Sequence, residues 1–377
     1  MNTEAQTDPT TANIIHEQTF PLPLVPPNGR ERPLRIAYIG PAHGTSLQRA
    51  RALERLGHQV SIVDPWAWLG RSKWTGRWLR HAGGIGAHLI IGDRLFQAVA
   101  QTRPDLIWVN QGEFLGPPIV RRLRTLKVPI VNYANDNPFS GRDGLRFRYY
   151  QRAIPLYDLL VVTFEENVDQ ARAAGGKRLM RVWLTADERA HQPRKLNPQI
   201  REQYAADVAF IGTWMPERGP FMAELIRRGV PLSIWGDGWQ KAPEWPIIAP
   251  RWRGPGIYDD DSYAAVIQSS RICLGLLSKG NRNLHTGRSI QIPAIGGLLC
   301  AERTAEHLAL YDEGTEAVFW NDAAECATQC HRLLADEDLR ASISKRSHER
   351  ALRNNLFNEP QMASILRAVF DESDPTQ

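Results

Sequence analysis

The sequence predicts an α/β chain of two Rossmann-like, doubly wound domains that face a central cleft. The chain has 377 residues, whereas single hydrophobic cores stop growing at roughly 250 to 300 residues. Short apolar runs alternate with helical patterns, as in a parallel sheet that is covered on both faces. The run RIAYIG at 35–40 is echoed by DVAFIG at 207–212. We expect the ligand between the domains, because such sheets bind at the carboxyl ends of their strands.

The first domain opens as strand, loop, helix and strand. RIAYIG is followed by the loop PAHGTS and by a helical pattern that stops at Gly57. Its strands are expected at 35–40, 58–64, 104–110, 128–136, 158–163 and 177–183. Later helices are expected near 118–126, 144–153 and 165–174.

A polar, proline-containing stretch then interrupts the alternation and predicts a linker. The strands of the second domain are expected at 207–212, 230–236, 271–277, 297–302 and 316–320. The final helices, from about 322 to 370, are expected to cross back to the first domain. The predicted boundaries are a disordered tail at 1–33, a first domain at 34–185, a linker at 186–206, a second domain at 207–345, and a C-terminal helix and tail at 346–377.

Composition places the chain among ordinary globular proteins, with 42% hydrophobic and 23% charged residues. No apolar run approaches the roughly 18 residues of a membrane span, and no secretory signal pattern begins the chain. Four cysteines in so long a chain suit a reducing compartment, so we expect a cytoplasmic protein. The net charge of +5 is dispersed, which argues against nucleic acid and leaves nucleotides and anionic lipids as candidate partners.

Neither glycine loop has the spacing of a cofactor-binding fingerprint. GPAHG and GTWMPERG lack G-x-G-x-x-G, and no G-x-x-x-x-G-K-[ST] phosphate loop occurs. The interpretations as a nicotinamide, flavin or ATP-hydrolysing protein lose their support, and no cofactor is expected. Cys326, Cys330 and His331 have helical spacing, but a zinc site needs four ligands, so no metal is expected there.

The segment 288–320 carries the most chemical information. One helix begins after HTGRS, a buried strand follows, and a second helix begins at 302–304. Two helix N-termini with free N–H groups and Arg288 beside them form an anion site suited to a diphosphate.

This segment resembles the C-terminal domain of group 1 glycosyltransferases with the GT-B fold, and specifically their CgeB-like branch. That branch reads approximately Arg-x-Phe-Glu-Ile-Pro-Ala-x-Gly-Gly, then Thr-x-x-His, then Gly-x-Glu. The residues that fit in order are Arg288, Ile292, Pro293, Ala294, Gly296, Gly297, Thr304, His307, Gly314 and Glu316. The resemblance continues in 208–239, in WVNQGEFL at 108–115 and in YANDNP at 133–138. It implies transfer of a sugar from a nucleoside diphosphate to a glycan, lipid or protein acceptor.

The resemblance also implies that basic side chains and helix dipoles, instead of a metal, neutralise the leaving diphosphate. Arg218 and Arg288 are the candidates, with Lys279 in reserve. The remaining donor-binding candidates are Gly212, Thr213, Gln291, Gly296, Gly297, Thr304 and His307. Thr304 has an alternative role as a helix cap. Trp239 matches a position beside the base, or belongs to the core.

Gln291 departs from the family pattern. It stands where the Glu-x7-Glu pattern carries its donor-binding glutamate, and the earlier position falls near Asn283. Amides can still hold ribose hydroxyls. A neutral amide cannot act as a carboxylate toward developing positive charge, which weakens the retaining mechanism that the resemblance suggests.

The acceptor side offers His43, Glu113 and Asp136, each just beyond a predicted strand. If the enzyme inverts, one of them should be the general base. Asp136 is alternatively a turn residue ahead of Pro138, and His43 a residue of the helix start.

The segment 66–81 interleaves tryptophans with arginines and a lysine, as a peripheral membrane contact or a lipid-linked acceptor would require. Gly70 and Gly76 are expected to interrupt a helix there, and packing against the first domain is the alternative. Asp259, Asp260 and Asp261 precede a helical pattern and are expected to complement its dipole.

Two other functions remain open at this point. A sugar-nucleotide epimerase has the same two-domain architecture. A catalytically silent GT-B module that binds a glycan or a partner is made credible by Gln291.

Overall fold

The computed structural model describes residues 14–16, 33–70 and 72–370. The chain forms two compact units: unit 1 comprises 1–183 and 362–377, and unit 2 comprises 184–361. The stretch 186–206, expected as a linker, lies within unit 2 and carries helix α8 (Pro198–Tyr204). The last helix, α16 (Asn358–Phe370), begins in unit 2 and ends in unit 1, so the C-terminal helix crosses back.

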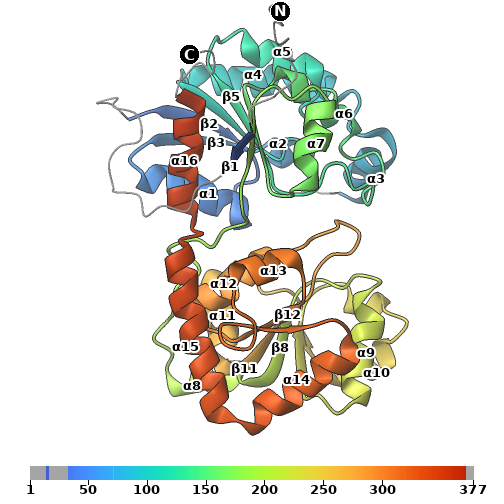
Figure 1. Ribbon diagram of the computed structural model, residues 1–377. Coiled ribbons are helices and arrows are strands. Elements are labelled where there is room, and N and C mark those ends of the chain that lie inside the picture. Colours follow the sequence, from blue (N-terminus) through green and yellow to red (C-terminus); the bar gives the residue numbers. More distant parts are fainter. Residues whose placement is uncertain (1–13, 17–32, 71, 371–377) are drawn as a thin grey trace, which may run out of the picture. The chain divides into compact units, whose positions relative to one another are not determined.

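Unit 1 contains a parallel sheet of seven strands in the order β1-β7-β6-β5-β4-β2-β3 (Figure 1). The strands are β1 (Ile14–His16), β2 (Arg35–Ile39), β3 (Gln59–Val63), β4 (Leu106–Asn110), β5 (Ile130–Ala134), β6 (Leu159–Val162) and β7 (Leu179–Arg181). The central strands β4 and β5 are buried along their whole length, which explains their largely apolar sequences. Strand β1 lies in the stretch predicted to be a disordered tail, and it adds to the edge by pairing with β7.

Helices cover both faces of this sheet. They are α1 (Gly44–Arg55), α2 (Pro65–Leu69), α3 (Lys73–Ala82), α4 (Ala87–Gln101), α5 (Pro117–Arg124), α6 (Arg148–Gln151), the 3₁₀ turn η1 (Ile154–Leu156) and α7 (Glu166–Ala173). Helices α1 and α16 share one apolar cluster with strand side chains of one face, whereas α4, α5 and α7 pack on the other (Figure 1). Helices α1 and α16, which lie far apart in the sequence, therefore complete the same part of the unit 1 core.

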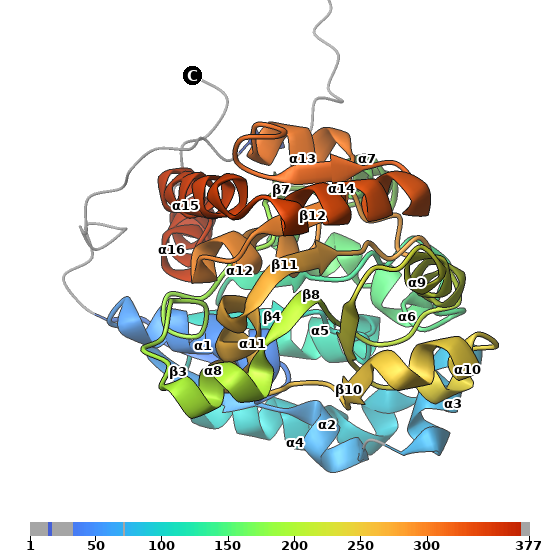
Figure 2. The same ribbon diagram turned by 90° about the horizontal axis from the view of Figure 1, so that it is seen from below.

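Unit 2 repeats this architecture with six parallel strands in the order β10-β9-β8-β11-β12-β13. The strands are β8 (Ala206–Ile211), β9 (Leu232–Trp235), β10 (Trp252–Gly254), β11 (Ser270–Gly275), β12 (Leu299–Glu302) and β13 (Val318–Trp320). The remaining helices are α9 (Arg218–Arg227), η2 (Trp239–Lys241), α10 (Trp245–Ile248), η3 (Ala249–Arg251), α11 (Asp260–Ser269), α12 (Gly287–Ile295), α13 (Ala305–Leu310), α14 (Ala323–Ala335) and α15 (Glu337–Asn354). Helices α9, α10 and α14 lie on one face of the sheet, and α8, α11, α12 and α15 lie on the other (Figure 2).

Each sheet reverses its strand order once. The reversal falls between β2 and β4 in unit 1 and between β8 and β11 in unit 2. At such a switch point the loops that follow two neighbouring strands diverge to opposite faces, which leaves a crevice at the carboxyl ends of the strands. The two switch points are therefore the places to look for a site.

Candidate functional site

Two arginines occupy the switch point of unit 2. Arg218, at the start of α9, donates to the Thr213 carbonyl at 2.7 Å and to the Leu277 carbonyl at 3.3 Å. Arg288, in the first turn of α12, donates to the Ile211 carbonyl at 3.2 Å. Both also donate to the Leu276 carbonyl at 3.4 Å. Since β8 ends at Ile211 and β11 ends at Gly275, the two guanidinium groups bridge the ends of the strands on either side of the reversal.

The same two guanidinium groups lie near the ring of Phe210. Their Cζ atoms are 5.4 and 5.6 Å from the ring centroid for Arg218 and Arg288, respectively. Arg288 forms no ion pair with any described residue, and its Nε, which is buried, has no hydrogen-bond acceptor there. Burial lowers the pKa of Arg288, but an arginine stays charged at neutral pH. A half-buried cation that is held only by neutral carbonyls is suited to receiving an anion.

Glycines make room around these groups. A side chain on Gly236 would meet the carbonyl oxygen of Gly212 at 2.0 Å, and one on Gly212 would meet the Phe210 ring at 2.7 Å. The Gly212 carbonyl accepts from Trp239 Nε1 at 3.0 Å. Trp239 is fully buried and packs edge-on against Phe210, so its role is in the core. Thr213 contributes its backbone carbonyl, while its side chain is exposed.

Gln291 lies one turn further along α12, on the same helix as Arg288. Its side chain is buried, and its Oε1 accepts from the hydroxyl of Tyr263 at 3.0 Å. Its Nε2 lies 2.9 Å from the point where a side chain on Gly287 would begin. The Tyr263 hydroxyl therefore occupies the acceptor oxygen of the amide, which leaves the NH₂ group to donate. Asn283, at the earlier family position, donates to the His285 carbonyl at 3.2 Å.

Thr304 and His307 have partners inside unit 2. The Thr304 hydroxyl accepts from the His307 amide at 3.0 Å, as an N-cap, and donates to the Leu284 carbonyl at 2.6 Å. His307 Nδ1 donates to the Glu302 carbonyl at 2.6 Å, and its Nε2 accepts from the Ser289 hydroxyl at 2.7 Å. Burial lowers the pKa of His307 to about 4, so the ring is neutral at pH 7. These bonds leave neither ring nitrogen for a ligand; both residues brace the α12 N-terminus.

Gly296 and Gly297 lie at the other end of α12, ahead of β12, and do not join the arginines. Gly296 is the C-cap, with φ of 93°. A side chain on Gly297 would meet Ile267 at 2.6 Å. A left-handed cap and close packing explain why glycine is needed at these positions, and donor binding by them stays a prediction.

Lys279, the reserve cation, is paired with Glu302. Asp259 accepts from the Ser262 amide at 2.7 Å as the N-cap of α11, in line with its expected place at a helix start.

A cluster of three thiols adds Cys300 to Cys326 and Cys330, which the sequence had connected by their helical spacing. The sulfur atoms of Cys300, Cys326 and Cys330 all lie within 4.8 Å of one another in the core of unit 2. His331 instead contacts the Arg228 carbonyl at 2.9 Å. The described residues supply no fourth ligand to this cluster, so it lacks the ligand set of a structural zinc site.

In unit 1, acidic residues gather where β4 and β5 end. Glu113 is buried and accepts from Arg146 at 3.0 Å, and Arg146 also pairs with Asp143 at 3.3 Å. The carboxylate of Asp136 makes no hydrogen bond with a described residue. Burial raises the pKa of Asp136; Arg146 opposes this rise, and the negative charge of Glu113 adds to it. Asp136 is therefore the carboxylate of this cluster that can accept a proton from a ligand.

His43 lies in the next loop, at the N-cap of α1, with an exposed side chain that makes no capping bond. Sequence reasoning missed two arginines at this edge. Arg146 organises the acidic cluster, and Arg49 donates to Asn110 Oδ1 at 3.0 Å beneath the loop. Neither lies in a recognisable motif, and only their tertiary contacts reveal them.

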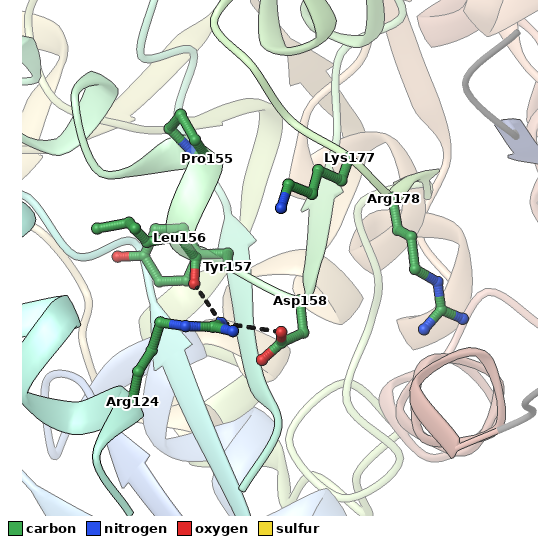
Figure 3. Close-up of a pocket in the computed structure, with 7 residues that line it drawn as sticks. All are labelled: Arg124, Pro155, Leu156, Tyr157, Asp158, Lys177 and Arg178. Atoms are coloured by element: carbon green, nitrogen blue, oxygen red, sulfur yellow. Dashed lines mark hydrogen bonds and ion pairs between the residues drawn. The ribbon is translucent and has the colours of Figure 1, made fainter. Parts of the chain in front are cut away.

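A cavity of about 300 Å³ opens elsewhere in unit 1 (Figure 3). It is lined by Arg124, Pro155, Leu156, Tyr157, Asp158, Lys177 and Arg178. Arg124 donates to the Leu156 carbonyl and to Asp158, both at 2.9 Å. The cavity lies where β6 and β7 begin, which is the wrong edge of the sheet for a switch-point ligand.

Comparison with known proteins gives a family match to part of the chain and several solved structures of similar fold. Residues 218–365 match the model of a family described as glycosyl transferase-like, and this range begins at Arg218 and includes Arg288. No curated protein matches the chain. The fold is GT-B, with two Rossmann-like α/β units.

Solved structures share this fold along most of the chain. Anabaena Alr3699/HepE, crystallised with UDP and glucose, is 15% identical with a TM-score of 0.63, over 89% of this chain and 100% of that chain. Sucrose-phosphate synthase from Thermosynechococcus elongatus is 14% identical with a TM-score of 0.63, over 89% and 98%. The trehalose 6-phosphate synthase of Burkholderia multivorans is 14% identical with a TM-score of 0.60, over 90% and 98%.

Proposed function

We propose that the protein is a glycosyltransferase that moves a sugar from a nucleoside-diphosphate sugar without a metal ion. The observation that carries this proposal is Arg288. It is a half-buried cation at the switch point of unit 2, and it has no acidic partner among the described residues. The match of 218–365 to a glycosyl transferase-like family supports the same reaction. UDP-glucose is the donor to test first, because Alr3699/HepE was crystallised with it.

In this proposal the arginines stabilise the leaving group. Cleavage of the anomeric C–O bond transfers an electron pair to the departing diphosphate oxygen, and its negative charge grows in the transition state. Arg218 and Arg288 supply two fixed positive charges at the strand ends, as a divalent metal would in other enzymes. The α12 N-terminus adds its backbone N–H groups. Gln291, with its NH₂ available, donates to a ribose hydroxyl.

The acceptor is activated from unit 1 in the same proposal. Asp136 takes the proton of the acceptor hydroxyl as that oxygen attacks the anomeric carbon, so the configuration inverts. The amide at Gln291 favours this course, because a retaining enzyme would use a carboxylate at the family position. The motif at 288–316 supports the CgeB-like branch as the subgroup, and four free thiols support a cytoplasmic location.

The proposal is tested by Arg288→Ala and Arg288→Lys. We expect UDP and UDP-glucose to raise the melting temperature of the wild-type protein and to have little effect on Arg288→Ala. Release of UDP should fall about 100-fold to 1,000-fold in Arg288→Ala, the usual cost of losing one charge-stabilising donor. Arg288→Lys should recover part of the binding, because it keeps the charge but loses the two-pronged geometry.

A matched control is Arg253→Ala. Arg253 also lies near an aromatic ring, with its Cζ 5.4 Å from the centroid of Trp235, but it is exposed. This variant should behave as wild type. Unchanged UDP binding and turnover in Arg288→Ala would refute the donor site, and loss of activity on adding EDTA would refute metal independence.

One observation favours a second function, a silent GT-B module. Gln291 replaces a carboxylate at the position where the family binds its donor. Such a module would bind UDP-glucose and give no UDP release with any of a panel of glycan, lipid and protein acceptors, whereas an enzyme releases UDP in the presence of its acceptor.

A further inference from the structure

Helix α3, the turn at 83–86 and the first turn of α4 expose large apolar side chains. Trp74 is 77% exposed, Ile85 55%, Leu89 81% and Ile90 65%. Burying such side chains is favourable, so a group of them exposed in one short stretch is a candidate docking surface. We call this stretch, 73–90, the α3–α4 surface. Arg71, which belongs to the predicted basic and aromatic segment, lies outside the described residues.

A side-chain hydrogen bond ties helix α3 to the turn that precedes α4. Trp78, one turn after Trp74 on α3, donates through Nε1 to the Ile85 carbonyl at 3.1 Å. Ser72 caps α3 by accepting from the Thr75 amide at 3.1 Å, and the helix runs through Gly76 to Ala82. The expectation that Gly76 would interrupt this helix was therefore wrong. Its cap and its packing outweigh the cost of about 1 kcal/mol for one glycine.

The charge of this surface is of one sign. Lys73, Arg77, Arg80 and His81 are exposed beside the apolar side chains, and the Arg77 guanidinium lies 5.7 Å from the Trp74 ring centroid. No acidic residue occurs between Asp64 and Asp93. Asp64 is occupied as the cap of α2, and Asp93 is paired with Arg122. Nothing acidic in that sequence interval therefore offsets the cations.

We propose that the α3–α4 surface docks unit 1 onto the anionic face of a phospholipid bilayer. Trp, Leu and Ile side chains insert at the level of the headgroups and upper acyl chains, while lysine and arginine bind the lipid phosphates. A soluble protein partner would have to supply an acidic rim around an apolar centre. A bilayer with anionic lipid supplies both the negative charge and the apolar interior. We therefore infer a membrane rather than a protein as the partner. The inference goes beyond sugar transfer, since it concerns where the protein works.

The test measures sedimentation of the full-length protein with vesicles. The vesicles are phosphatidylcholine alone or phosphatidylcholine with about one third phosphatidylglycerol. We expect sedimentation only with phosphatidylglycerol, and weaker sedimentation at high salt. The triple variant K73Q/R77Q/R80Q should weaken binding about 100-fold, from roughly fivefold per charge. The double variant L89S/I90S should weaken it at least about tenfold through lost apolar insertion.

Matched controls come from α15 of unit 2. Leu352→Ser removes an exposed leucine, and K345Q/R346Q removes two exposed charges. Both should sediment as wild type does. Circular dichroism and the UDP-induced shift in melting temperature confirm that each variant is folded, and they do not depend on the membrane. Equal sedimentation of L89S/I90S and wild type would overturn the proposal. A dimer in light scattering that L89S/I90S dissolves, without vesicle binding, would assign the surface to a second copy instead.

Discussion

Neighbours decide the chemistry of each charged residue in this protein. Lys279 and Arg288 are both cations beyond β11, yet Lys279 is paired with Glu302 and Arg288 meets only carbonyls and an aromatic ring. The acidic cluster of unit 1 shows the same contrast. Glu113 is paired with Arg146, whereas the Asp136 carboxylate is left without a hydrogen bond among the described residues. Arg288 and Asp136, which form no ion pair with a described residue, are the charged groups that can serve a ligand.

Asp136→Asn tests the proposed base. The amide cannot take a proton, so kcat should fall by about 100-fold to 10,000-fold while the UDP-induced shift in melting temperature stays as in wild type. Because burial raises the pKa of Asp136, the acid limb of the wild-type profile of kcat/KM should lie above the pKa of about 3.9 of an ordinary aspartate. Activity is lost as the pH falls through that limb, since protonation removes the base.

Asp143→Asn is the control for this prediction. It removes the same charge from the same cluster, but its carboxylate is paired with Arg146 at 3.3 Å. Its kcat should stay within about threefold of wild type, as for a partly exposed ion pair. Equal losses in the two variants would show that Asp136 acts only through the charge of the cluster.

The sequence predicted where Arg218 and Arg288 lie in the fold, but it did not predict the contacts of His307. Arg218 and Arg288 lie at the starts of the helices that follow β8 and β11, and such helices begin at the carboxyl edge of a parallel sheet. His307 matched the family motif, yet its ring nitrogens contact Ser289 and the Glu302 carbonyl. Those contacts form only when α12 and α13 pack against each other, so no local sequence pattern predicts them. Tyr263 and Arg146 were missed for the same reason.

Helix α12 is the element that carries the donor site, and it contains a proline. Pro293 has no N–H, so the carbonyl four residues earlier, that of Ser289, has no partner within the helix. The Tyr311 hydroxyl donates to that carbonyl at 2.9 Å. On the opposite side, the Pro293 carbonyl accepts from His348 Nδ1 at 2.9 Å. The hydroxyl of Tyr311, just beyond α13, thus replaces the N–H donor that the proline removes, while His348 of α15 adds a further contact to the same helix.

Tyr311→Phe should lower the free energy of unfolding by about 1 to 3 kcal/mol, because it leaves a buried carbonyl without a donor. The same change should cost less in a Pro293→Ala background, since the alanine supplies the backbone N–H that Pro293 lacks. Urea denaturation of the four proteins of this cycle measures the coupling. Equal costs in both backgrounds would mean that the Tyr311 hydroxyl does not substitute for the missing helix bond.

The strands with an apolar run were predicted well, and two short edge strands were missed. Strands β2 to β9 and β11 to β13 fall within or close to the predicted ranges, and they include the edge strands β3 and β13. Strand β1 has only three residues and is defined by its pairing with β7, so it carries no periodic signal. Strand β10 likewise joins an edge through three residues. These two short edge strands depend on a neighbour rather than on their own apolar pattern.

At the scale of the whole molecule, the last helix belongs to the core of the first unit. Met362, Ile365 and Leu366 of α16 are fully buried, and they pack with Trp108, Tyr133 and other side chains of the unit 1 sheet. The sequence predicted a helix that crosses back, from its length, but not which strands it covers. Unit 1 therefore cannot complete its core until the end of the chain has been made.

Leu366→Ala tests this dependence. Removing the buried side chain should lower the free energy of unfolding by about 2 to 5 kcal/mol, through lost burial and the cavity that remains. The loss should appear in unit 1, although the substitution lies eleven residues from the end of the chain. Hydrogen exchange should accelerate at the amides of β2, β4 and β5 and stay unchanged in β8 and β11. Leu352→Ala, an exposed leucine on α15, should change stability by less than about 0.5 kcal/mol. Faster exchange confined to unit 2 would show that α16 does not hold the first sheet together.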